Sequence, residues 1–465
     1  RLIAAGFSLV CIWTTLFSTA MPEVRLNVFL ALVLVIGYLH YPIRRVHLVR
    51  PPEGQKARFR IVTAINRIEP NTIPVVDIVL LLMGVIPLLY FATHAEPIIK
   101  LALKVTSPRN PDHVFYICLA VSALLSMAEL CRRCVGLPIL CVVGLLLIYA
   151  LSTVRPGKVI YDLFYSTGEG LRGTPIDVCA KYIVVFVIFG AFLERTGISA
   201  FFIDLANCIA GAAAGGPAKV AVISSGLCGM VSGSSVGNTV TTGSVTIPMM
   251  IKAGYLPHFA GAVEAAASTG GQLMPPIMGA AAFLLAEYMG MPYAQVALVA
   301  ILPAVLYFAG IYIAVHLEAR RLGLKGISRE GLPRFTELLP RSYLLLPLVI
   351  LVGLVAGSVY TMQTSATLAI GAAVAVGILN PRVKLTLSTV IDALASGGRS
   401  TITVASACGM AGLVAGCITT TGLASELVTA IVGISGGYAL PALVLTMLCC
   451  IVLGMGVPTT ANYCI

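Results

Sequence analysis

Charged side chains are scarce in this sequence. Only 11% of its 465 residues are Asp, Glu, Lys or Arg, and 58% are hydrophobic, whereas about a quarter of an ordinary soluble domain is charged. About 20 apolar residues span a bilayer core, and runs of that kind recur from one end of the chain to the other. The composition therefore predicts a polytopic membrane protein and argues against nucleic-acid binding and soluble catalysis.

Motifs of enzymatic chemistry are also lacking. The sequence has no Gly-x-x-x-x-Gly-Lys-Ser/Thr loop, which excludes ATP hydrolysis through a Walker site. Gly233-Ser-Ser-Val-Gly237 matches the nucleophile elbow of hydrolases, but that motif needs a preceding strand and a downstream Asp/Glu and His pair. Here the flanking segments are apolar and helical in pattern. We therefore expect no enzyme, no ATPase partner and no covalent cofactor.

Basic residues concentrate in two loops, and short loops rich in Lys and Arg lie in the cytoplasm. The first loop covers residues 42–73 and the second covers 317–341, with these side chains: Arg44, Arg45, Arg50, Lys56, Arg58, Arg60, Arg67, Arg320, Arg321, Lys325, Arg329, Arg334 and Arg341. If residues 211–251 crossed the membrane once, alternation would place the second loop outside. If they form a re-entrant hairpin, that loop falls inside, so the charge pattern favours the hairpin.

The regular helical spans are expected from the apolar runs. They lie near 2–18, 24–41, 74–93, 114–130, 135–152, 178–194, 293–316, 342–358, 362–379 and 400–420, with a proline-broken span at 257–290. These runs predict an all-α polytopic membrane protein with about 11 transmembrane helices plus re-entrant hairpins.

An internal repeat supports the hairpin. Thr196-Gly197-Ile198 is followed by Gly229-Met230. Thr421-Gly422-Leu423 is followed by Gly454-Met455 after the same number of residues, and the two copies are 225 residues apart. The same shift carries Ser234-Ser235 onto Thr459-Thr460. By the topology above, the first copy enters from the cytoplasm and the second from outside. An inverted repeat of this kind is a common plan of secondary transporters.

Two segments of the first repeat are candidates for a binding site. Gly and hydroxyl residues crowd Gly229–Asn238, which predicts irregular backbone offering carbonyl and hydroxyl oxygens to a small cation, although a small-residue packing face is an alternative. In Gly270-Gly-Gln-Leu-Met-Pro-Pro276, two prolines must break the helix. The break is either part of a transporter site or a packing kink. The 225-residue shift would place a second break near 495–501, beyond the sequence, and both ends of the chain look cut.

Carboxylates inside apolar spans are few, namely Glu129, Glu194, Glu264 and Glu287. Each is a functional candidate by default, but Glu129 and Glu194 stand next to arginines at helix ends. Glu264 precedes the broken segment by about two turns and is the best candidate for a coupling role. So few acids favour Na⁺ held by neutral oxygens over a proton relay.

At these residues the chain resembles the fused membrane (permease) subunit of tripartite ATP-independent periplasmic (TRAP) transporters. The resemblance rests on Ser232-Gly-Ser-Ser-Val-Gly-Asn238, Thr241–Pro248, Glu264–Gly279 and Leu453–Ala461. It implies Na⁺-coupled uptake of an organic acid through an elevator mechanism in the bacterial inner membrane. A periplasmic solute-binding receptor, of the TAXI type, would deliver the substrate.

The resemblance also implies a domain plan and a site. Residues 1–153 would be a small N-terminal membrane domain, and 154–465 a large, C-terminally incomplete transport domain with repeats at about 178–316 and 342–465. The implied substrate residues are Ser232, Ser234, Ser235, Asn238, Gln272, Pro275, Pro276, Thr459 and Thr460. The implied Na⁺ residues are Ser234, Gly237, Asn238, Gly270, Gly271, Gly454, Gly456 and Thr459. The alternative function is a channel or a structural membrane scaffold, and a membrane enzyme is a weaker third.

Overall fold

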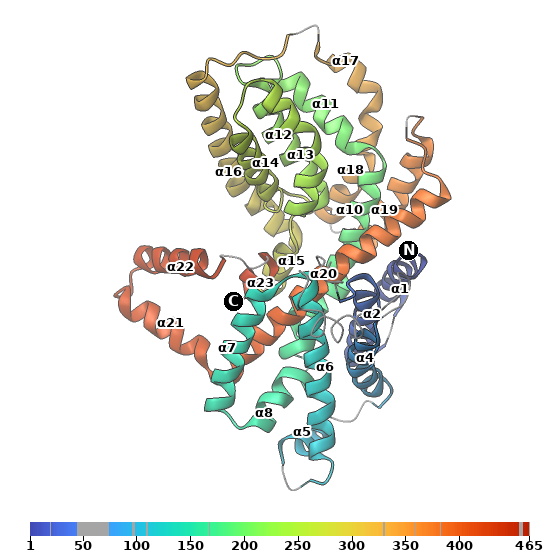
Figure 1. Cartoon of the computed structure of the whole chain (residues 1–465), viewed down its shortest axis with the longest axis vertical. Helices are drawn as coiled ribbons and strands as arrows, with labels where there is room; N and C mark the ends of the chain where they lie inside the picture. Colours follow the sequence, from blue (N-terminus) through green and yellow to red (C-terminus); the bar gives the residue numbers. More distant parts are fainter. Residues whose placement is uncertain are drawn as a thin grey trace, which may run out of the picture. The chain divides into compact units, whose positions relative to one another are not determined.

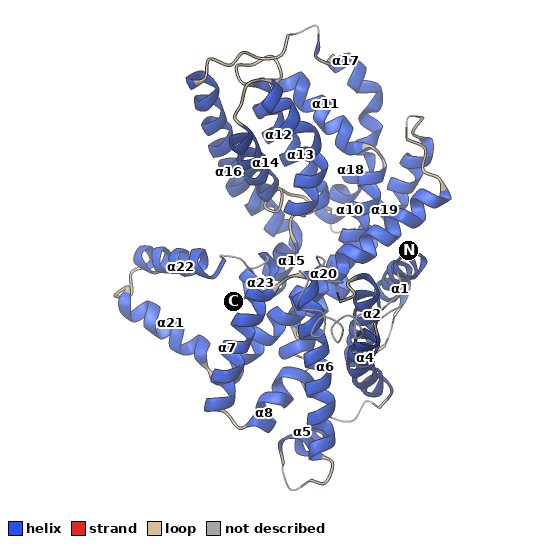
Figure 2. Ribbon diagram, in the orientation of Figure 1, coloured by secondary structure: helices blue, strands red, loops and turns tan. Residues whose placement is uncertain are grey.

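The computed structural model describes residues 1–18, 20–43, 74–94, 98–107, 110–166, 168–328, 331–357, 359–381, 383–454 and 459–464. Within these ranges the chain forms helices and no strand (Figure 2). Eight of the described helices are long and apolar enough to cross a membrane, and further apolar helices have 10–17 residues. The prediction of an all-α polytopic membrane protein is confirmed.

The helices divide into two compact units, each treated by itself. The first contains Arg1–Ser18 and Val178–Thr401, and the second contains Thr19–Asp177 and Ile402–Ile465 (Figure 1). The expected domain boundary after residue 153 stays a prediction.

The first unit holds the first repeat. Its helices are α1 (Leu2–Phe17), η3 (Cys179–Ile183), α10 (Val184–Arg195), α11 (Ile198–Ala210), α12 (Gly216–Ser232), α13 (Ser235–Lys252), α14 (Pro257–Gly270), α15 (Ala280–Met289), α16 (Tyr293–Arg321), α17 (Phe335–Leu338), η5 (Leu339–Leu345), α18 (Leu346–Ala356), α19 (Met362–Leu379) and the first part of α20 (Leu387–Thr421).

The second unit holds the remaining elements. They are α2 (Pro22–His40), α4 (Val75–Thr93), α5 (Ile98–Thr106), α6 (His113–Cys134), α7 (Leu137–Thr153), α8 (Pro156–Ile160), η1 (Tyr161–Tyr165), η2 (Gly170–Arg172), α9 (Thr174–Val178), the end of α20, α21 (Leu423–Ile434), α22 (Ala439–Gly454) and α23 (Thr459–Cys464).

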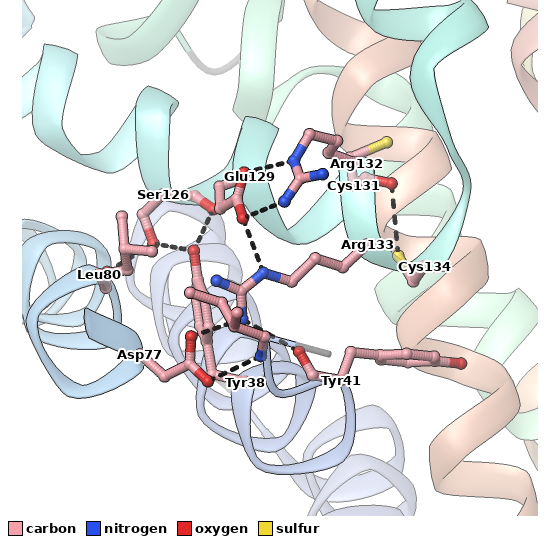
Figure 3. A network of polar contacts seen from close by, with 11 residues as sticks. Tyr38, Tyr41, Asp77, Leu80, Ser126, Glu129, Cys131, Arg132, Arg133 and Cys134 are labelled. Atoms are coloured by element: carbon pink, nitrogen blue, oxygen red, sulfur yellow. Dashed lines mark hydrogen bonds and ion pairs between the residues drawn. The ribbon is translucent and has the colours of Figure 1, made fainter. Parts of the chain in front are cut away.

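In the second unit, polar contacts tie the ends of three helices together. Arg133, in the last turn of α6, donates to the Asp77 carboxylate in the first turn of α4 at 2.7 Å (Figure 3). Arg133 also donates to the carbonyl of Tyr41, just after α2, at 3.0 Å. The end of α2 thus meets the start of α4 and the end of α6. This is the alternation that successive membrane crossings require.

In the first unit, α12 and α13 form a hairpin whose outer ends lie together. The Tyr255 hydroxyl, after α13, donates to the carbonyl of Gly215, before α12, at 3.4 Å, and burial raises the pKa of Tyr255 to about 12. The chain after α16 packs on this same end, since the Ile327 N–H donates to the Gly211 carbonyl at 2.9 Å. The predicted hairpin is therefore present as two helices joined by a short turn, with the basic loop at its base, and its re-entrance into the membrane stays a prediction. A single crossing would have separated these ends.

Small residues form the contact between the hairpin and its neighbours. A buried cluster joins α12, α13, α14 and α16, and its members are Ala218, Ala221, Val222, Met250, Tyr255, Ala260, Val263, Ala267, Val315 and Ala319. Helices that present Ala and Gly can approach closely. The cluster therefore holds the hairpin, α14 and α16 as one packed body.

The repeat is visible in the backbone. Gly197 and Gly422, one repeat apart, both adopt left-handed conformations (φ 84° and 75°) at the starts of α11 and α21. The helices leading into the two copies run antiparallel. The Asn380 amide, before α20, donates to the Thr196 carbonyl at the end of α10, whereas Gly397, further along α20, packs on Ile188 earlier in α10. The inversion of the second copy, which lies in the other unit, stays a prediction.

One helix is longer than its apolar run. The span expected at 400–420 belongs to α20, which begins at Leu387. Hydropathy misses its first turns because they carry polar and charged side chains, among them Asp392. That carboxylate pairs with Arg1, and the glycines at 397 and 398 pack closely on α10 and α1. Tertiary contacts thus stabilise a helical segment that its composition did not predict.

Candidate functional site

The tip of the hairpin consists of two non-helical residues. α12 ends at Ser232, Gly233 is left-handed (φ 59°), and Ser234 is extended before α13 begins. The Ser234 hydroxyl caps α13 by accepting from the Gly237 N–H at 3.2 Å. The prediction of irregular backbone over all of Gly229–Asn238 is wrong except at these two residues. The flanking small residues stay helical because they permit close packing, as the packing alternative required.

The helix break after α14 is confirmed. α14 ends at Gly270, α15 begins at Ala280, and the intervening turn contains a cis peptide bond between Pro275 and Pro276. The Gly279 N–H closes the turn by donating to the Gln272 carbonyl at 2.8 Å. The Tyr293 hydroxyl, at the start of α16, donates to the Pro276 carbonyl at 2.9 Å. Carbonyls of the non-helical turn are thus partly satisfied from α16.

The tip and the break pack directly on each other. Gly229 of α12 lies against Gly271, so closely that a Cβ on Gly271 would stand 2.6 Å from the Gly229 Cα. A Cβ on Gly233 would overlap the Met278 carbonyl oxygen. The Gln272 amide donates to the Ser235 hydroxyl at 3.0 Å. The structure therefore brings together two segments that lie about 40 residues apart, as the sequence predicted for one half of a site.

Asn238 holds an oxygen with no hydrogen-bond partner. Its side chain is 1% exposed, and its amide nitrogen donates to the Ser225 carbonyl at 2.8 Å. Its Oδ1 atom is buried and accepts no hydrogen bond. Amide carbonyl oxygens are ligands for hard cations, so this oxygen remains available to a ligand.

Glu264 is enclosed by hydroxyl groups. Its side chain is 0% exposed. Oε1 accepts from Ser225 at 2.7 Å, Thr242 at 2.5 Å and Ser268 at 3.0 Å, and Oε2 accepts from Thr246 at 2.5 Å. These donors come from α12, α13 and α14. The carboxylate therefore joins the helices that carry the tip and the break.

The other predicted residues of the first repeat lie around the tip. Ser232, Gly237, Pro275 and Pro276 are half-buried, Ser234 is exposed, and Gly270 is buried against the Tyr307 ring. Glu287 is exposed on α15, and Glu129 pairs with Arg132 and Arg133.

The second hairpin belongs to the other unit and is described only in part. Gly454 ends α22, and Thr459 is exposed at the start of α23. Gly456 and the side chain of Thr460 lie outside the described residues. A Cβ on Gly454 would stand 3.2 Å from the Asn462 amide nitrogen, so α23 folds back onto the end of α22.

Sequence reasoning missed two groups of residues. Asn462 closes the second hydroxyl motif as Asn238 closes the first, with one residue fewer between, and its Oδ1 atom is likewise buried without a partner. A comparison of the repeats that allowed a one-residue deletion would have found it. The hydroxyls around Glu264 were also missed. The spacing of Thr242 and Thr246, and of Glu264 and Ser268, puts each pair on one helix face, but no local pattern shows that those faces meet.

Comparisons with known proteins show the family of the chain. Residues 122–465 match the family model described as "Tripartite ATP-independent periplasmic transporter, DctM component". The chain is 27% identical over 238 residues to the uncharacterized protein YgiK of Salmonella typhimurium, covering 51% of this chain and 54% of that protein.

Two further relatives carry transporter names. The C4-dicarboxylate TRAP transporter large permease protein DctM of Pseudomonas aeruginosa is 27% identical over 187 residues, covering 40% of this chain and 43% of that protein. The isethionate TRAP transporter permease protein DctMQ of Oleidesulfovibrio alaskensis is 27% identical over 221 residues, covering 38% and 35%. The chain thus spans about half or less of the length of these relatives. Because the family model matches most of the chain, the protein belongs to the DctM-component family of tripartite ATP-independent periplasmic transporters.

Proposed function

We propose that the chain is the membrane subunit of a Na⁺-coupled importer of organic acids in the bacterial inner membrane. A periplasmic solute-binding receptor of the TAXI type delivers the substrate. The observation that carries the proposal is the contact between the hairpin tip at Gly233–Ser234 and the helix break at Gly271–Gly279. Facing broken segments inside a membrane protein are typical of transporter binding sites.

The proposed Na⁺ site uses neutral oxygens at the tip. The unpartnered Oδ1 of Asn238 supplies one ligand. The Ser234 hydroxyl supplies another, since its oxygen keeps a free lone pair after capping α13. Backbone oxygens of Gly237, Gly270 and Gly271 complete the first half of the site. Gly454, Gly456 and Thr459 are proposed to serve the second hairpin in the same way.

The substrate is proposed to bind beside these ions. Side chains of Ser232, Ser235 and Gln272 offer hydrogen bonds to a carboxylate, with Pro275 and Pro276 shaping the wall. The N-terminus of α13 directs amide groups toward an anion. Thr459 and Thr460 are the counterparts in the second repeat.

The transport step is proposed to be an elevator movement. Small residues and the buried Glu264 contacts tie α12, α13 and α14 together, so these helices can move as one body. Such a body would carry ion and substrate against a static scaffold without dismantling the half-site.

Uptake of labelled organic acids into proteoliposomes tests the proposal, using the full-length protein with its receptor, with and without an inward Na⁺ gradient. We expect accumulation that requires both receptor and Na⁺ and that is lost in the double variant Ser234→Ala, Thr459→Ala. The matched control is Ser244→Ala, an exposed serine on α13 whose hydroxyl donates to its own helix. Receptor-independent flux that only equilibrates would refute the proposal and indicate a channel.

A further inference from the structure

Glu264 differs from every other described carboxylate of the first unit, because it is completely buried without a cationic partner. Three of the others pair with arginines: Asp204 with Arg341, Glu318 with Arg321 and Asp392 with Arg1. The remainder are exposed: Glu194, Glu287 and Glu337. Around Glu264, no Lys, Arg or His nitrogen of the described residues comes within the 4.0 Å of an ion pair.

Among the described residues, none of the titratable or charged groups on the surrounding helices forms a hydrogen bond or an ion pair with it. These groups are Glu194 and Arg195 on α10, Asp204 and Cys208 on α11, Lys219 and Cys228 on α12, Lys252 on α13, His258 on α14, and Tyr293, Tyr307, Tyr312, His316, Glu318, Arg320 and Arg321 on α16. Lys219 places its ammonium group over the Tyr312 ring at 5.1 Å. All the direct partners of the Glu264 carboxylate are therefore hydroxyl groups.

A hydroxyl group can donate one hydrogen bond and accept two, so it can serve either protonation state of a carboxyl group. With Glu264 ionised, all four hydroxyls direct their protons at the carboxylate. With Glu264 protonated, its O–H donates to Thr246, and the Thr246 hydroxyl turns to the Thr242 carbonyl, 3.0 Å away. A lysine or arginine in the same place has no acceptor and would stabilise only the ionised form.

The same hydroxyls contact the tip through Asn238. Ser225 binds Glu264 through its hydroxyl and accepts from the Asn238 amide through its carbonyl at 2.8 Å. Thr242 lies 2.8 Å from the Asn238 carbonyl, the acceptor that its hydroxyl takes when it turns away from Glu264. Ser225 and Thr242 therefore contact both the Glu264 carboxyl group and Asn238, so the carboxyl group and the tip share hydrogen-bonding neighbours.

We propose that Glu264 takes up a proton from water and releases it once in each transport cycle, so that a proton is a coupling ion in addition to Na⁺. The proton adds to Oε2 to form a neutral carboxyl group, and the reverse step returns it to water on the other side. This inference rests on the proposed function. It deepens that proposal by assigning a second ion to the body that carries the site.

The test is uptake into proteoliposomes with a fixed Na⁺ gradient and a pH difference across the membrane, in which the outside solution is the more acidic. For one proton per substrate, a difference of one pH unit raises the accumulation ratio of the wild type by about tenfold, the ratio of the proton activities. Glu264→Gln keeps hydrogen-bonding groups of the same size, so we expect it to retain Na⁺-dependent exchange but not to respond to pH. Glu287→Gln, on the exposed face of α15, is the matched control and responds like the wild type.

A second measurement needs no transport. In the purified full-length protein, the infrared absorption of protonated carboxyl groups grows as the pH falls, and one component of it, from a carboxyl group shielded from water, should be missing in Glu264→Gln and retained in Glu287→Gln. Wild-type accumulation that ignores the pH difference overturns the inference even if Glu264→Gln does not fold, and so does an unchanged pH response in that variant. Loss of the Na⁺ requirement in the wild type would instead refute the proposed function.

Discussion

The contact between Gly229 and Gly271 provides the sharpest test of the half-site. Gly271 has φ −58° and ψ −27°, a conformation that alanine adopts without strain. The substitution Gly271→Ala therefore adds only a methyl group, which would stand 2.6 Å from the Gly229 Cα. Carbon atoms in contact lie about 3.5–4.0 Å apart, so the tip and the break must separate by about 1 Å.

That displacement exceeds what a binding site tolerates. Ligand groups must stay within about 0.5 Å of their productive positions, and overpacking of this kind costs about 1–3 kcal/mol. If that cost falls on the ion-bound geometry, the apparent affinity for Na⁺ drops by about 5- to 150-fold. We expect Na⁺-dependent uptake by Gly271→Ala to show this loss, measured as the Na⁺ concentration for half-maximal uptake.

The control is Gly261→Ala on α14, the helix that ends just before Gly271. A Cβ on Gly261 meets no atom within 4 Å, and alanine in a helix is favoured over glycine by about 1 kcal/mol. This variant should transport like the wild type and be at least as stable in detergent. An unchanged Na⁺ response in correctly inserted Gly271→Ala would show that the tip and the break do not form the ion site.

Three further predictions concern buried polar groups. Asp77→Asn removes one partner of a buried ion pair and should lower the free energy of unfolding by about 3 kcal/mol in thermal unfolding. Arg132→Gln removes one partner of a half-exposed ion pair and should lower it by at most about 1 kcal/mol. Equal effects of the two substitutions would contradict this prediction. Thr246→Val deprives Oε2 of Glu264 of its one hydroxyl donor and should lower stability by about 1–3 kcal/mol, while the exposed Thr269→Val should not. Tyr293→Phe leaves carbonyls of the helix break without their donor, so its unfolding free energy should fall by about 1 kcal/mol or more, and an unaltered value would mean that water replaces the hydroxyl.

Local features of the sequence determined the elements of this protein. Apolar runs of about 20 residues can only be helices in a bilayer, since no other segment satisfies its own backbone there. Consecutive prolines at 275 and 276 required a break wherever the helix lay. The count of basic residues in the loop at 317–341 was enough to choose a hairpin over a crossing, because positive loops stay on one side of the membrane.

Predictions from local features were wrong where packing between helices determined the backbone conformation. The Gly and Ser content of Gly229–Asn238 predicted irregular structure, but most of this stretch is helical because α14 lies against it. The polar first turns of α20 lie outside its apolar run, yet they are helical because α10 and α1 pack on their glycines. Propensity and hydropathy describe a segment without its neighbours. Here, contacts with neighbouring helices determine the conformation.

The sequence alone thus determined the class of the protein and pointed to the two segments that pack on each other at the tip and the break. Only the tertiary structure decided that Glu264 is held by hydroxyls from three helices and that Asn238 and Asn462 keep unpartnered oxygens. The physical reason is that helical periodicity fixes which side chains share a face, whereas the choice of facing helix depends on contacts between residues far apart in the chain.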